Sequence, residues 1–258
     1  MSRTALITGA TLGIGNAIAE EFARNGVDLV ITARDADALE SLAAEWSKTY
    51  KVKVTGHAAD LAKPGAAEGF ADALSARGVV LDYLVNNAGF GTFGLLRDSK
   101  LDDEVAMMTL NMTSLAVLTR RFLPQMLERK GKIMNVASTA AFQPGPYMAV
   151  YYATKAFVLS FTEALASELA GTGVTVTAFC PGATQSGFQD RSGMHESVLV
   201  KGRKLPTSEE VGRAGFRAMM AGRRVYVPGL LNKMLAQSVR FTPRKLVTFI
   251  AKKITGPA

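Results

Sequence analysis

The architecture of this chain follows from one short segment, Thr8-Gly9-Ala10-Thr11-Leu12-Gly13-Ile14-Gly15. It joins a short apolar run, Ala5–Ile7, to a longer stretch, Ile14–Arg24, in which apolar residues recur with the period of a helix. Glycines at a strand-to-helix turn let the backbone bend tightly and approach a phosphate closely. The unpaired N–H groups at the start of the helix favour the negative charge. The segment predicts a dinucleotide-binding turn, although its spacing is G-x-x-x-G-x-G and not G-x-G-x-x-G.

Short β-branched runs alternate with longer helix-period stretches along the rest of the chain. We expect further strands at Leu29–Thr32, Val52–Gly56, Leu81–Val85, Lys132–Val136, Val174–Phe179 and Arg224–Val227. We expect further helices at Ala36–Tyr50, Gly65–Ala76, Asp102–Arg129 and Tyr151–Ala170. Strands that alternate with helices pair in parallel through right-handed crossovers. The pattern predicts an α/β fold: a single-domain Rossmann-type doubly wound parallel sheet over residues 1–258, with helices on both faces.

Composition narrows the class of protein. The 258 residues are 48% hydrophobic, which is enough for one large core. A single cysteine, Cys180, excludes an internal disulfide and favours a reducing compartment. The start of the sequence has no signal-peptide pattern, and no apolar run is long enough to span a membrane, so we expect a cytoplasmic protein. The two histidines, His57 and His195, lie far from any cysteine cluster, so no metal site is expected.

The end of the second expected strand bears on which dinucleotide is bound. NAD sites place an acidic residue there to bind the ribose 2′-hydroxyl, whereas this chain has Ala33 followed by Arg34 and Asp35. The guanidinium of Arg34 is suited to a 2′-phosphate, which favours NADP(H). NAD(H) stays open, because Asp35 either caps the next helix or turns back to a ribose.

A tyrosine and a lysine one helical turn apart supply candidate proton chemistry. Tyr151 and Lys155 share a helix face, and an ammonium beside a phenol lowers the phenol's pKa. Ser138 follows the strand Lys132–Val136, at the sheet edge where doubly wound folds bind ligands. Its hydroxyl is placed to hold a carbonyl oxygen while Tyr151 donates or accepts a proton.

With these residues in hand, the sequence resembles the short-chain dehydrogenase/reductase family. The residues that carry the resemblance run from position 8 to position 184 in the family's order and spacing: TGATLGIG (8–15), Asp60-Leu61, NNAG (86–89), Asn111, Ser138, YYATK (151–155) and PGAT (181–184). The resemblance implies a reaction in which hydride moves between nicotinamide C4 and a carbonyl or alcohol carbon. It also implies NADP(H) preference through Arg34-Asp35, and a homodimer or homotetramer formed by the two long middle helices.

The resemblance implies a catalytic tetrad of Asn111, Ser138, Tyr151 and Lys155. Tyr151 is then the acid/base, Ser138 orients the substrate, and Lys155 holds the nicotinamide ribose and tunes Tyr151. Asn111 keeps a proton-relay water in place through a helix irregularity. The resemblance also implies cofactor contacts, with Asp60 at the adenine, Asn87 in the nucleotide cleft and the 181–184 loop at the nicotinamide. The implied cofactor-binding residues are Gly9, Thr11, Gly13, Ile14, Gly15, Arg34, Asp60, Leu61, Asn87, Ala88, Gly89, Tyr151, Lys155, Pro181, Gly182 and Thr184.

Apolar side chains on the loops expected at this edge indicate a hydrophobic substrate, with core packing as the alternative. They are Phe90, Phe93, Phe142, Pro144, Tyr147, Met148, Phe188 and Met194. The polar, glycine-containing segment of about residues 187–206 is expected to be a substrate lid. A non-catalytic NADP(H)-binding regulator is the alternative function, which the intact tetrad disfavours. Nucleic-acid binding is not expected, because only the net charge of +8 supports it.

The positive charge is concentrated in the tail, about residues 229–258. Residues 1–200 carry 17 basic and 20 acidic residues, whereas residues 201–258 carry 13 basic and 2 acidic ones. Pro243 is expected to divide the tail into two short amphipathic helices. We expect them to pack near the substrate entrance, on the domain or on a partner subunit. A weak contact with an anionic membrane surface and an anionic carrier-bound substrate are the alternatives.

Overall fold

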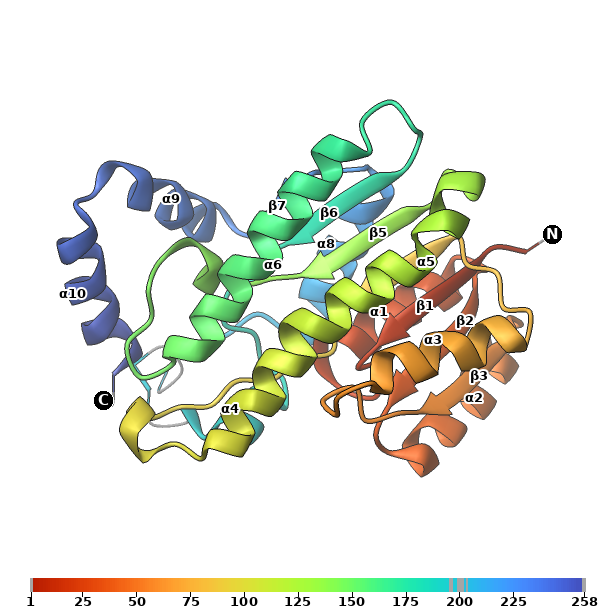
Figure 1. Cartoon of the computed structure of the whole chain (residues 1–258), viewed down its shortest axis with the longest axis horizontal. Helices are drawn as coiled ribbons and strands as arrows, with labels where there is room; N and C mark the ends of the chain where they lie inside the picture. Colours follow the sequence, from red (N-terminus) through yellow and green to blue (C-terminus); the bar gives the residue numbers. More distant parts are fainter. Residues whose placement is uncertain (1, 195–196, 199–201, 203, 257–258) are drawn as a thin grey trace.

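A seven-stranded parallel sheet forms the centre of the computed structural model, which describes residues 2–194, 197–198, 202 and 204–256. The strand order is β3-β2-β1-β4-β5-β6-β7, so the order reverses between β1 and β4 (Figure 1). This confirms the doubly wound Rossmann-type sheet. The strands are β1 Thr4–Thr8, β2 Asp28–Ala33, β3 Val54–Ala58, β4 Tyr83–Asn86, β5 Lys132–Val136, β6 Thr175–Phe179 and β7 Val225–Tyr226.

Helices cover both faces of the sheet. One face carries α1 Gly13–Arg24, α2 Ala36–Tyr50 and α8 Ser208–Met220. The other carries α3 Ala66–Ala76, α4 Leu101–Met108, α5 Leu115–Arg129 and α6 Ala149–Glu168. Around the substrate edge lie the short α7 Phe188–Ser192 and the 3-10 turns η1 Leu96–Asp98 and η3 Thr139–Phe142. The C-terminal part contains α9 Leu230–Ser238, the 3-10 turn η5 Val239–Phe241 and α10 Arg244–Thr255.

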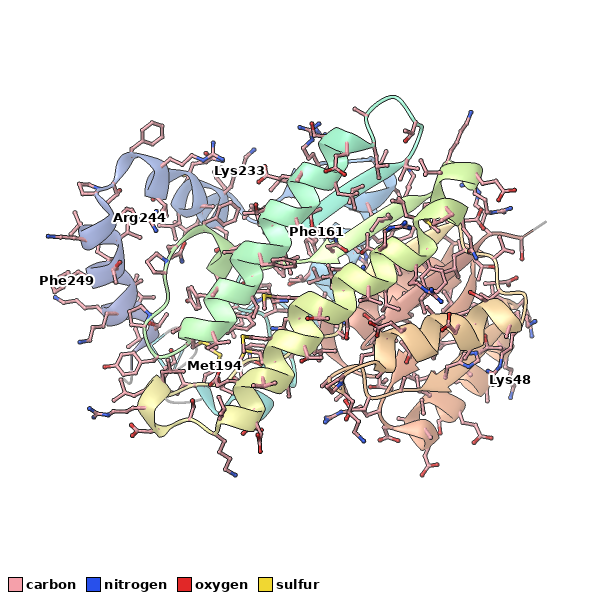
Figure 2. The ribbon with its side chains drawn as sticks, in the orientation of Figure 1. Lys48, Phe161, Met194, Lys233, Arg244 and Phe249 are labelled. Atoms are coloured by element: carbon pink, nitrogen blue, oxygen red, sulfur yellow. The ribbon has the colours of Figure 1, made fainter. Side chains whose placement is uncertain are left out.

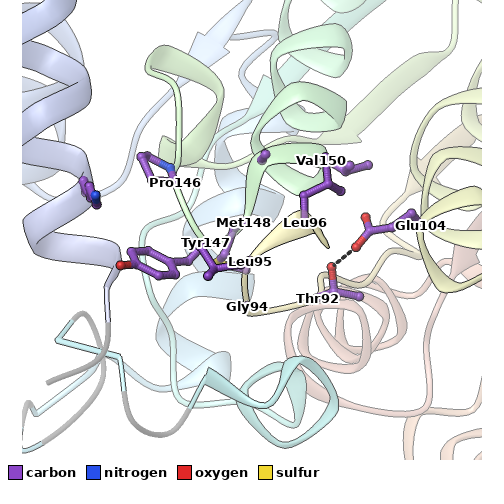
Figure 3. A pocket seen from close by; sticks show the side chains of 11 residues that line it. Thr92, Gly94, Leu95, Leu96, Glu104, Pro146, Tyr147, Met148 and Val150 are labelled. Atoms are coloured by element: carbon purple, nitrogen blue, oxygen red, sulfur yellow. Dashed lines mark hydrogen bonds between the residues drawn. The ribbon is translucent and has the colours of Figure 1, made fainter. Parts of the chain in front are cut away.

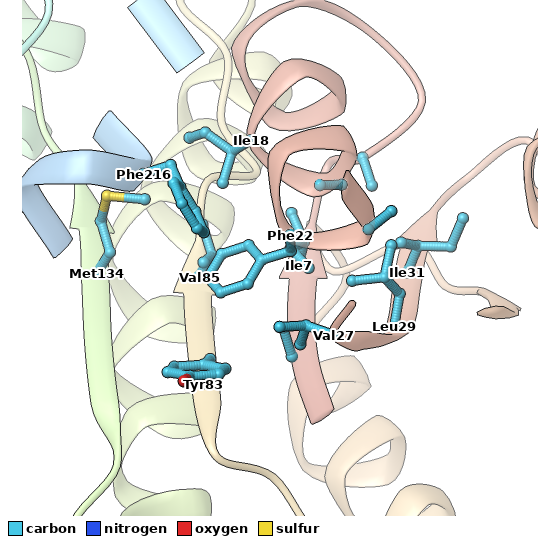
Figure 4. Packing of buried hydrophobic residues seen from close by; sticks show 14 of the residues in the cluster. Ile7, Ile18, Phe22, Val27, Leu29, Ile31, Tyr83, Val85, Met134 and Phe216 are labelled. Carbon is cyan, nitrogen blue, oxygen red and sulfur yellow. The ribbon is translucent and has the colours of Figure 1, made fainter. Parts of the chain in front are cut away.

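The central strands are apolar on both sides because helices cover both faces. In β1, Ile7 packs with Val85 and Met134 toward α1 and α8, whereas its neighbour Leu6 packs toward α3 and α5. Figure 4 shows the first of these layers, with Phe22 of α1 at its centre. This two-sided burial fixes the carboxyl ends of β1, β4, β5 and β6 along one rigid edge.

The structure divides one of the expected helices and adds another that was not expected. The stretch 102–129 is not one helix, because a π-helical turn, η2 Thr109–Ser114, separates α4 from α5. Helix α8 was not expected, although Thr207 and Glu210 form a capping box at its start. Several strands also shift by one or two residues at their ends, as β3 does from Val52–Gly56 to Val54–Ala58.

Two peripheral segments flank the substrate edge. The ends of the 187–206 segment meet where Gln185 bridges to Thr207, so this segment leaves and rejoins the body at one point. His195 lies outside the described residues. Helices α9 and α10 are separated by η5, and Pro243 directly precedes α10. We call α9, η5 and α10 together, residues 230–255, the C-terminal arm. The arm projects at the β7 end of the sheet (blue in Figure 1).

Candidate active site

Hydrogen bonds at Thr8 join the glycine turn to the NNAG segment. Its hydroxyl, at the end of β1, accepts hydrogen bonds from the backbone N–H groups of Asn87 and Ala88 at 3.0 and 2.9 Å. The Asn87 side chain donates in return to the carbonyl oxygens of Thr8 and Gly9 at 3.0 and 3.1 Å. The NNAG segment and the glycine turn are therefore locked together at the centre of the edge.

The glycine turn has the shape of a phosphate cradle. Gly9 and Gly13 adopt left-handed backbone angles, with φ of 67° and 61°. A Cβ on Gly15 would lie 2.2 Å from both the Gly9 carbonyl oxygen and the Asn87 side-chain nitrogen. At the start of α1, Leu12 provides no side-chain cap and the first turn holds no acidic residue. The N–H groups there are thus left for an anion, and Thr11 and Ile14 lie in the same turn.

A small hollow beside the turn gathers residues that the sequence predicted for cofactor binding. It is lined by Gly9, Thr32, Ala33, Arg34, Ala59, Asp60, Leu61, Ala88 and Leu110. These residues include four that the sequence predicted for cofactor binding besides Gly9. Asp35 caps α2 by accepting a hydrogen bond from the Ala38 N–H at 3.0 Å, so its carboxylate is already engaged. Arg34 is exposed at the mouth of the hollow.

Ser138, Tyr151 and Lys155 meet at the ends of β5 and α6. The Ser138 hydroxyl lies within reach of the Tyr151 hydroxyl and donates to the Pro181 carbonyl oxygen at 3.4 Å. The Lys155 ammonium lies 5.8 Å from the centre of the Tyr151 ring and donates to the Val136 carbonyl oxygen at 2.8 Å. Lys155 is 6% exposed, which is rare for a lysine. The structure thus brings together three of the four residues of the implied tetrad around one point.

Asn111 lies behind this group, in the π-helical turn η2. Its amide nitrogen donates to the carbonyl oxygen of Phe90 and to the hydroxyl of Thr154, each at 3.0 Å. Its amide oxygen accepts from the Phe90 N–H at 3.2 Å. The side chain therefore pins the NNAG loop to α6, and the helix irregularity coincides with Asn111.

The 181–184 loop closes the edge on the β6 side. The Pro181 carbonyl oxygen accepts from the Thr139 N–H at 2.9 Å, and Thr184 donates to the Gly182 carbonyl oxygen at 3.0 Å. A Cβ on Gly182 would lie 2.7 Å from the Asn232 side-chain nitrogen, which belongs to the C-terminal arm. The arm therefore reaches the loop expected to hold the nicotinamide.

Comparison with known proteins identifies the family and its fold. The family model described as short chain dehydrogenase matches residues 3–197. The chain belongs to this family. It is 39% identical to a serine 3-dehydrogenase of Rhizobium radiobacter over 221 residues, which cover 82% of this chain and 85% of that protein.

Two solved structures of the family resemble this short-chain dehydrogenase closely. A short-chain dehydrogenase from Sphingobium yanoikuyae in complex with NADPH has a TM-score of 0.81 and 31% identity, over 94% of this chain and 97% of that one. The bulky-bulky ketone specific alcohol dehydrogenase from Comamonas testosteroni has a TM-score of 0.78 and 28% identity, over 94% and 95%. The expected membership, fold and enzyme class are thereby confirmed.

Burial shifts the pKa values of Tyr151 and Lys155 in this short-chain dehydrogenase. It raises the pKa of Tyr151 to about 12, and the hydrogen bond with Ser138 offsets part of that rise. It lowers the pKa of Lys155 to about 8. At neutral pH the phenol therefore keeps its proton while most of the lysine is charged.

Part of the expected apolar lining surrounds Tyr151. Phe93, Met148, Phe188 and Met194 cluster around the ring, and the Phe188 ring lies 5.2 Å from it. A Cβ on Gly91 would come within 3.0 Å of the Tyr151 ring, so the space there depends on a glycine that the sequence did not single out. Phe90 instead packs in the hydrophobic core beneath α3 and α5, and Phe142 packs against the core between α6 and β6.

A cavity of about 270 Å³ adjoins this cluster through Met148 (Figure 3). It is lined by Thr92, Gly94, Leu95, Leu96, Glu104, Pro146, Tyr147, Met148, Ala149, Val150 and Lys252. The Thr92 hydroxyl donates to Glu104 at 2.9 Å, and Lys252 belongs to the C-terminal arm. Sequence patterns missed Thr92 and Glu104, since neither lies in a motif.

The described part of the chain offers no group of three or more His, Cys, Asp or Glu residues placed to hold a metal. Within the same residues, no helix has the length and apolar character needed to cross a bilayer.

Proposed function

We propose that this enzyme interconverts a carbonyl and an alcohol on a hydrophobic substrate, with NADP(H) as the hydride carrier. The observation that carries the proposal is the contact of Tyr151 with Ser138 above Lys155, beside a glycine turn shaped for a pyrophosphate. When bound, the nicotinamide supplies or accepts hydride at its C4 carbon.

The protein's own part is to position the substrate oxygen and move a proton. Ser138 and Tyr151 donate hydrogen bonds to a carbonyl oxygen, and Tyr151 transfers its proton as negative charge develops there. The Lys155 ammonium stabilises the resulting phenolate, because an opposite charge favours the ionised form. In the direction of alcohol oxidation the same phenolate accepts the proton. Asn111 fixes the loop and the helix that carry these groups.

Two features of the hollow support a preference for NADP(H). Arg34 stands exposed at its mouth, where a guanidinium can pair with a 2′-phosphate. Asp35, the acid that directly follows Arg34, is engaged as the cap of α2. Solved relatives hold NADPH or NADP, as in the Sphingobium yanoikuyae complex, which agrees with this assignment.

A substitution in the glycine turn is predicted to weaken cofactor binding. Gly15→Ala places a methyl group 2.2 Å from a backbone oxygen of the same turn, so the turn has to move. We expect binding of NADPH, measured by fluorescence titration, to weaken at least about tenfold and the free energy of unfolding to fall by about 1–3 kcal/mol.

Gly69→Ala is the matched control for this variant. Gly69 lies within α3 with open space around its Cα, so an alanine there is expected to stabilise the protein by about 0.5–1 kcal/mol and leave binding unchanged. Unaltered NADPH binding in Gly15→Ala would contradict the cradle.

The pKa of Lys155 predicts the pH dependence of reduction. Well below pH 8 the ammonium is charged and supports the forming phenolate, so the reduction rate should be steady from about pH 6 to 7. As the pH rises through 8 the charge is lost and the reduction rate should fall. Alcohol oxidation should instead rise from about pH 6 to 8, because a larger fraction of Tyr151 is ionised while Lys155 is still charged. Initial rates in both directions across this range test the prediction. A falling limb that stays at the same pH in Lys155→Arg would show that another group causes it.

Exposed apolar side chains on α4 and α6 support the proposed homo-oligomer. Leu101 and Val105 on α4 and Phe157 on α6 are all exposed, although each is large and apolar. Light scattering of the purified protein should therefore give a dimer or tetramer.

A direct assay distinguishes the enzyme from a non-catalytic NADP(H)-binding regulator. NADPH oxidation is followed by absorbance with a panel of aldehydes and ketones that runs from small and polar to bulky and apolar. We expect turnover, with higher kcat/KM for the bulky apolar members because of the side chains around Tyr151. Binding of NADPH without turnover of any member would favour the regulator.

A further inference from the structure

The C-terminal arm exposes an unusual amount of apolar surface. Among the described residues, nine of the 17 large apolar side chains that are exposed lie in this arm. They are Leu230, Leu231, Met234, Leu235, Phe241, Leu246, Phe249, Ile250 and Ile254. Phe241, at the turn between the two helices, is 88% exposed. So many exposed apolar groups in about 25 residues make the arm a candidate binding surface.

This surface is separate from the face that docks the arm on the domain. In α10 the buried residues are Val247, Ala251 and Thr255, which follow the spacing of one helix face. Phe249 and Ile250 stand on other sides of the same helix and remain exposed. Docking on the domain, which the sequence analysis expected, therefore uses only one side of the arm. The remaining apolar side chains of the arm are exposed in the described structure.

The charge of the arm is of one sign. Glu210 is the last acidic residue of the sequence, and ten lysines and arginines follow it. Six of them, Lys233, Arg240, Arg244, Lys245, Lys252 and Lys253, lie in the arm and are exposed. Figure 2 shows Phe249 and Arg244 on the outer side of the arm, at the opposite end of the molecule from Lys48. Lys253 lies 4.7 Å from the Phe249 ring, so basic and apolar groups share one surface.

We propose that the outer surface of the C-terminal arm docks on a phospholipid bilayer that contains anionic lipids. Short helices that combine exposed leucine and phenylalanine with lysine and arginine insert at the headgroup boundary, where the basic groups meet lipid phosphates. A second copy of this chain is disfavoured as the occupant, because a symmetric contact through this surface would bring like charges together. Since no described helix can span a bilayer, the contact is peripheral.

The two ends of the arm contact loops beside the active site, so docking of the arm bears on how the substrate arrives. Thr255 donates to the Pro146 carbonyl oxygen at 2.8 Å, and Ser197 donates to the Thr255 carbonyl oxygen at 3.0 Å. At the other end of the arm, Asn232 lies against Gly182. Both ends are thus fixed to loops beside the active site, so docking brings those loops to the bilayer. If the proposed function holds, the enzyme takes apolar carbonyl or alcohol substrates that are dissolved in the membrane.

Vesicle flotation tests the docking without reference to activity. The full chain is mixed with vesicles of phosphatidylcholine alone, or of phosphatidylcholine with phosphatidylglycerol, at low and high ionic strength. We expect flotation with the anionic vesicles at low ionic strength, a decrease at high ionic strength, and little flotation with the neutral vesicles. Absence of flotation at low ionic strength, or equal flotation with both vesicle types, would overturn the proposal. Absence of flotation would instead favour an acidic protein as the partner of this surface.

Two variants locate the contact. Arg244→Glu/Lys245→Glu removes two basic residues from the first turn of α10, where acidic residues stabilise a helix, so the fold should persist. It should weaken partitioning by at least about 30-fold. Leu235→Ser/Phe241→Ser removes apolar groups that are already exposed, and should also reduce flotation. Lys48→Glu/Lys51→Glu is the charge control. Lys48 lies in the last turn of α2, at the opposite end of the molecule, and Lys51 directly follows this helix, so the variant should float like the wild type.

Two further readouts separate the remaining outcomes. Light scattering should give the same assembly size for Leu235→Ser/Phe241→Ser as for the wild type, and a smaller assembly would show that the surface joins subunits instead. Anionic vesicles should raise the wild-type rate on a long-chain ketone and not on a water-soluble one. Flotation without this rate difference would leave the docking in place and contradict membrane delivery of the substrate.

Discussion

Tyr151→Phe should lower turnover by about 10³-fold or more while NADPH binding changes less than about threefold. The substitution removes the one hydroxyl that contacts Ser138 beside the Lys155 ammonium, and leaves the ring packed against Phe188. The glycine turn and the small hollow beside it do not involve this hydroxyl. Initial rates with a reactive ketone and fluorescence titration with NADPH give the two quantities.

Tyr152→Phe is the control for this variant. Tyr152 is the adjacent residue on α6, and its ring packs against Gly145 instead of lying over Lys155. Its loss of a hydroxyl should leave turnover within a few-fold of wild type. Turnover of Tyr151→Phe near that of Tyr152→Phe would remove Tyr151 as the acid/base.

The second large effect concerns the choice of dinucleotide. Ala33→Asp/Arg34→Ala should change the ratio of kcat/KM for NADPH to that for NADH by about 10³-fold in favour of NADH. The lost guanidinium contact with a 2′-phosphate accounts for about 1.5–3 kcal/mol, and the new carboxylate repels the phosphate while accepting from a ribose hydroxyl. Both positions line the same hollow, so neither change disturbs the catalytic group.

Arg34→Ala alone separates the two contributions. It should weaken the use of NADPH and leave the use of NADH almost unchanged, because only the phosphate needs the guanidinium. A wild-type enzyme that uses NADH and NADPH equally well, or a single variant that weakens both, would contradict the role assigned to Arg34.

The features that the sequence predicted well are those that local pattern determines. The glycine turn needs backbone conformations open to glycine, as the φ values of Gly9 and Gly13 confirm. Tyr151 and Lys155 share a helix face whatever surrounds them. The burial of every central strand likewise follows from runs of apolar residues between helical stretches.

The features that were missed depend on contacts between distant segments. The sequence placed Thr8 at the start of the glycine turn, and only the fold brings the N–H groups of Asn87 and Ala88 to its hydroxyl. The pairing of Asn232 with Gly182 joins segments about 50 residues apart in the same way. The direction of the pKa shift at Tyr151 was also predicted wrongly. The helix spacing predicted that Lys155 would lower this pKa, whereas burial, which depends on the whole site, raises it, and Ser138 offsets part of that rise.

Helix α8 and the break between α4 and α5 were missed for a different reason. The capping box of α8 was present in the sequence, but the helix buries small residues such as Gly212 and Gly215, which weaken the helical pattern. The π-helical turn inserts into a stretch whose composition is helical throughout, so its position at Asn111 came only from the family resemblance.

Isotope transfer tests the central claim most directly. The enzyme is incubated with NADPH that carries deuterium at nicotinamide C4 and with a bulky apolar ketone, and the product is examined by mass spectrometry. We predict an alcohol with deuterium on the former carbonyl carbon for the wild type, and none above background for Tyr151→Phe. An alcohol without deuterium from either C4 position, or equal labelling by both proteins, would contradict the account.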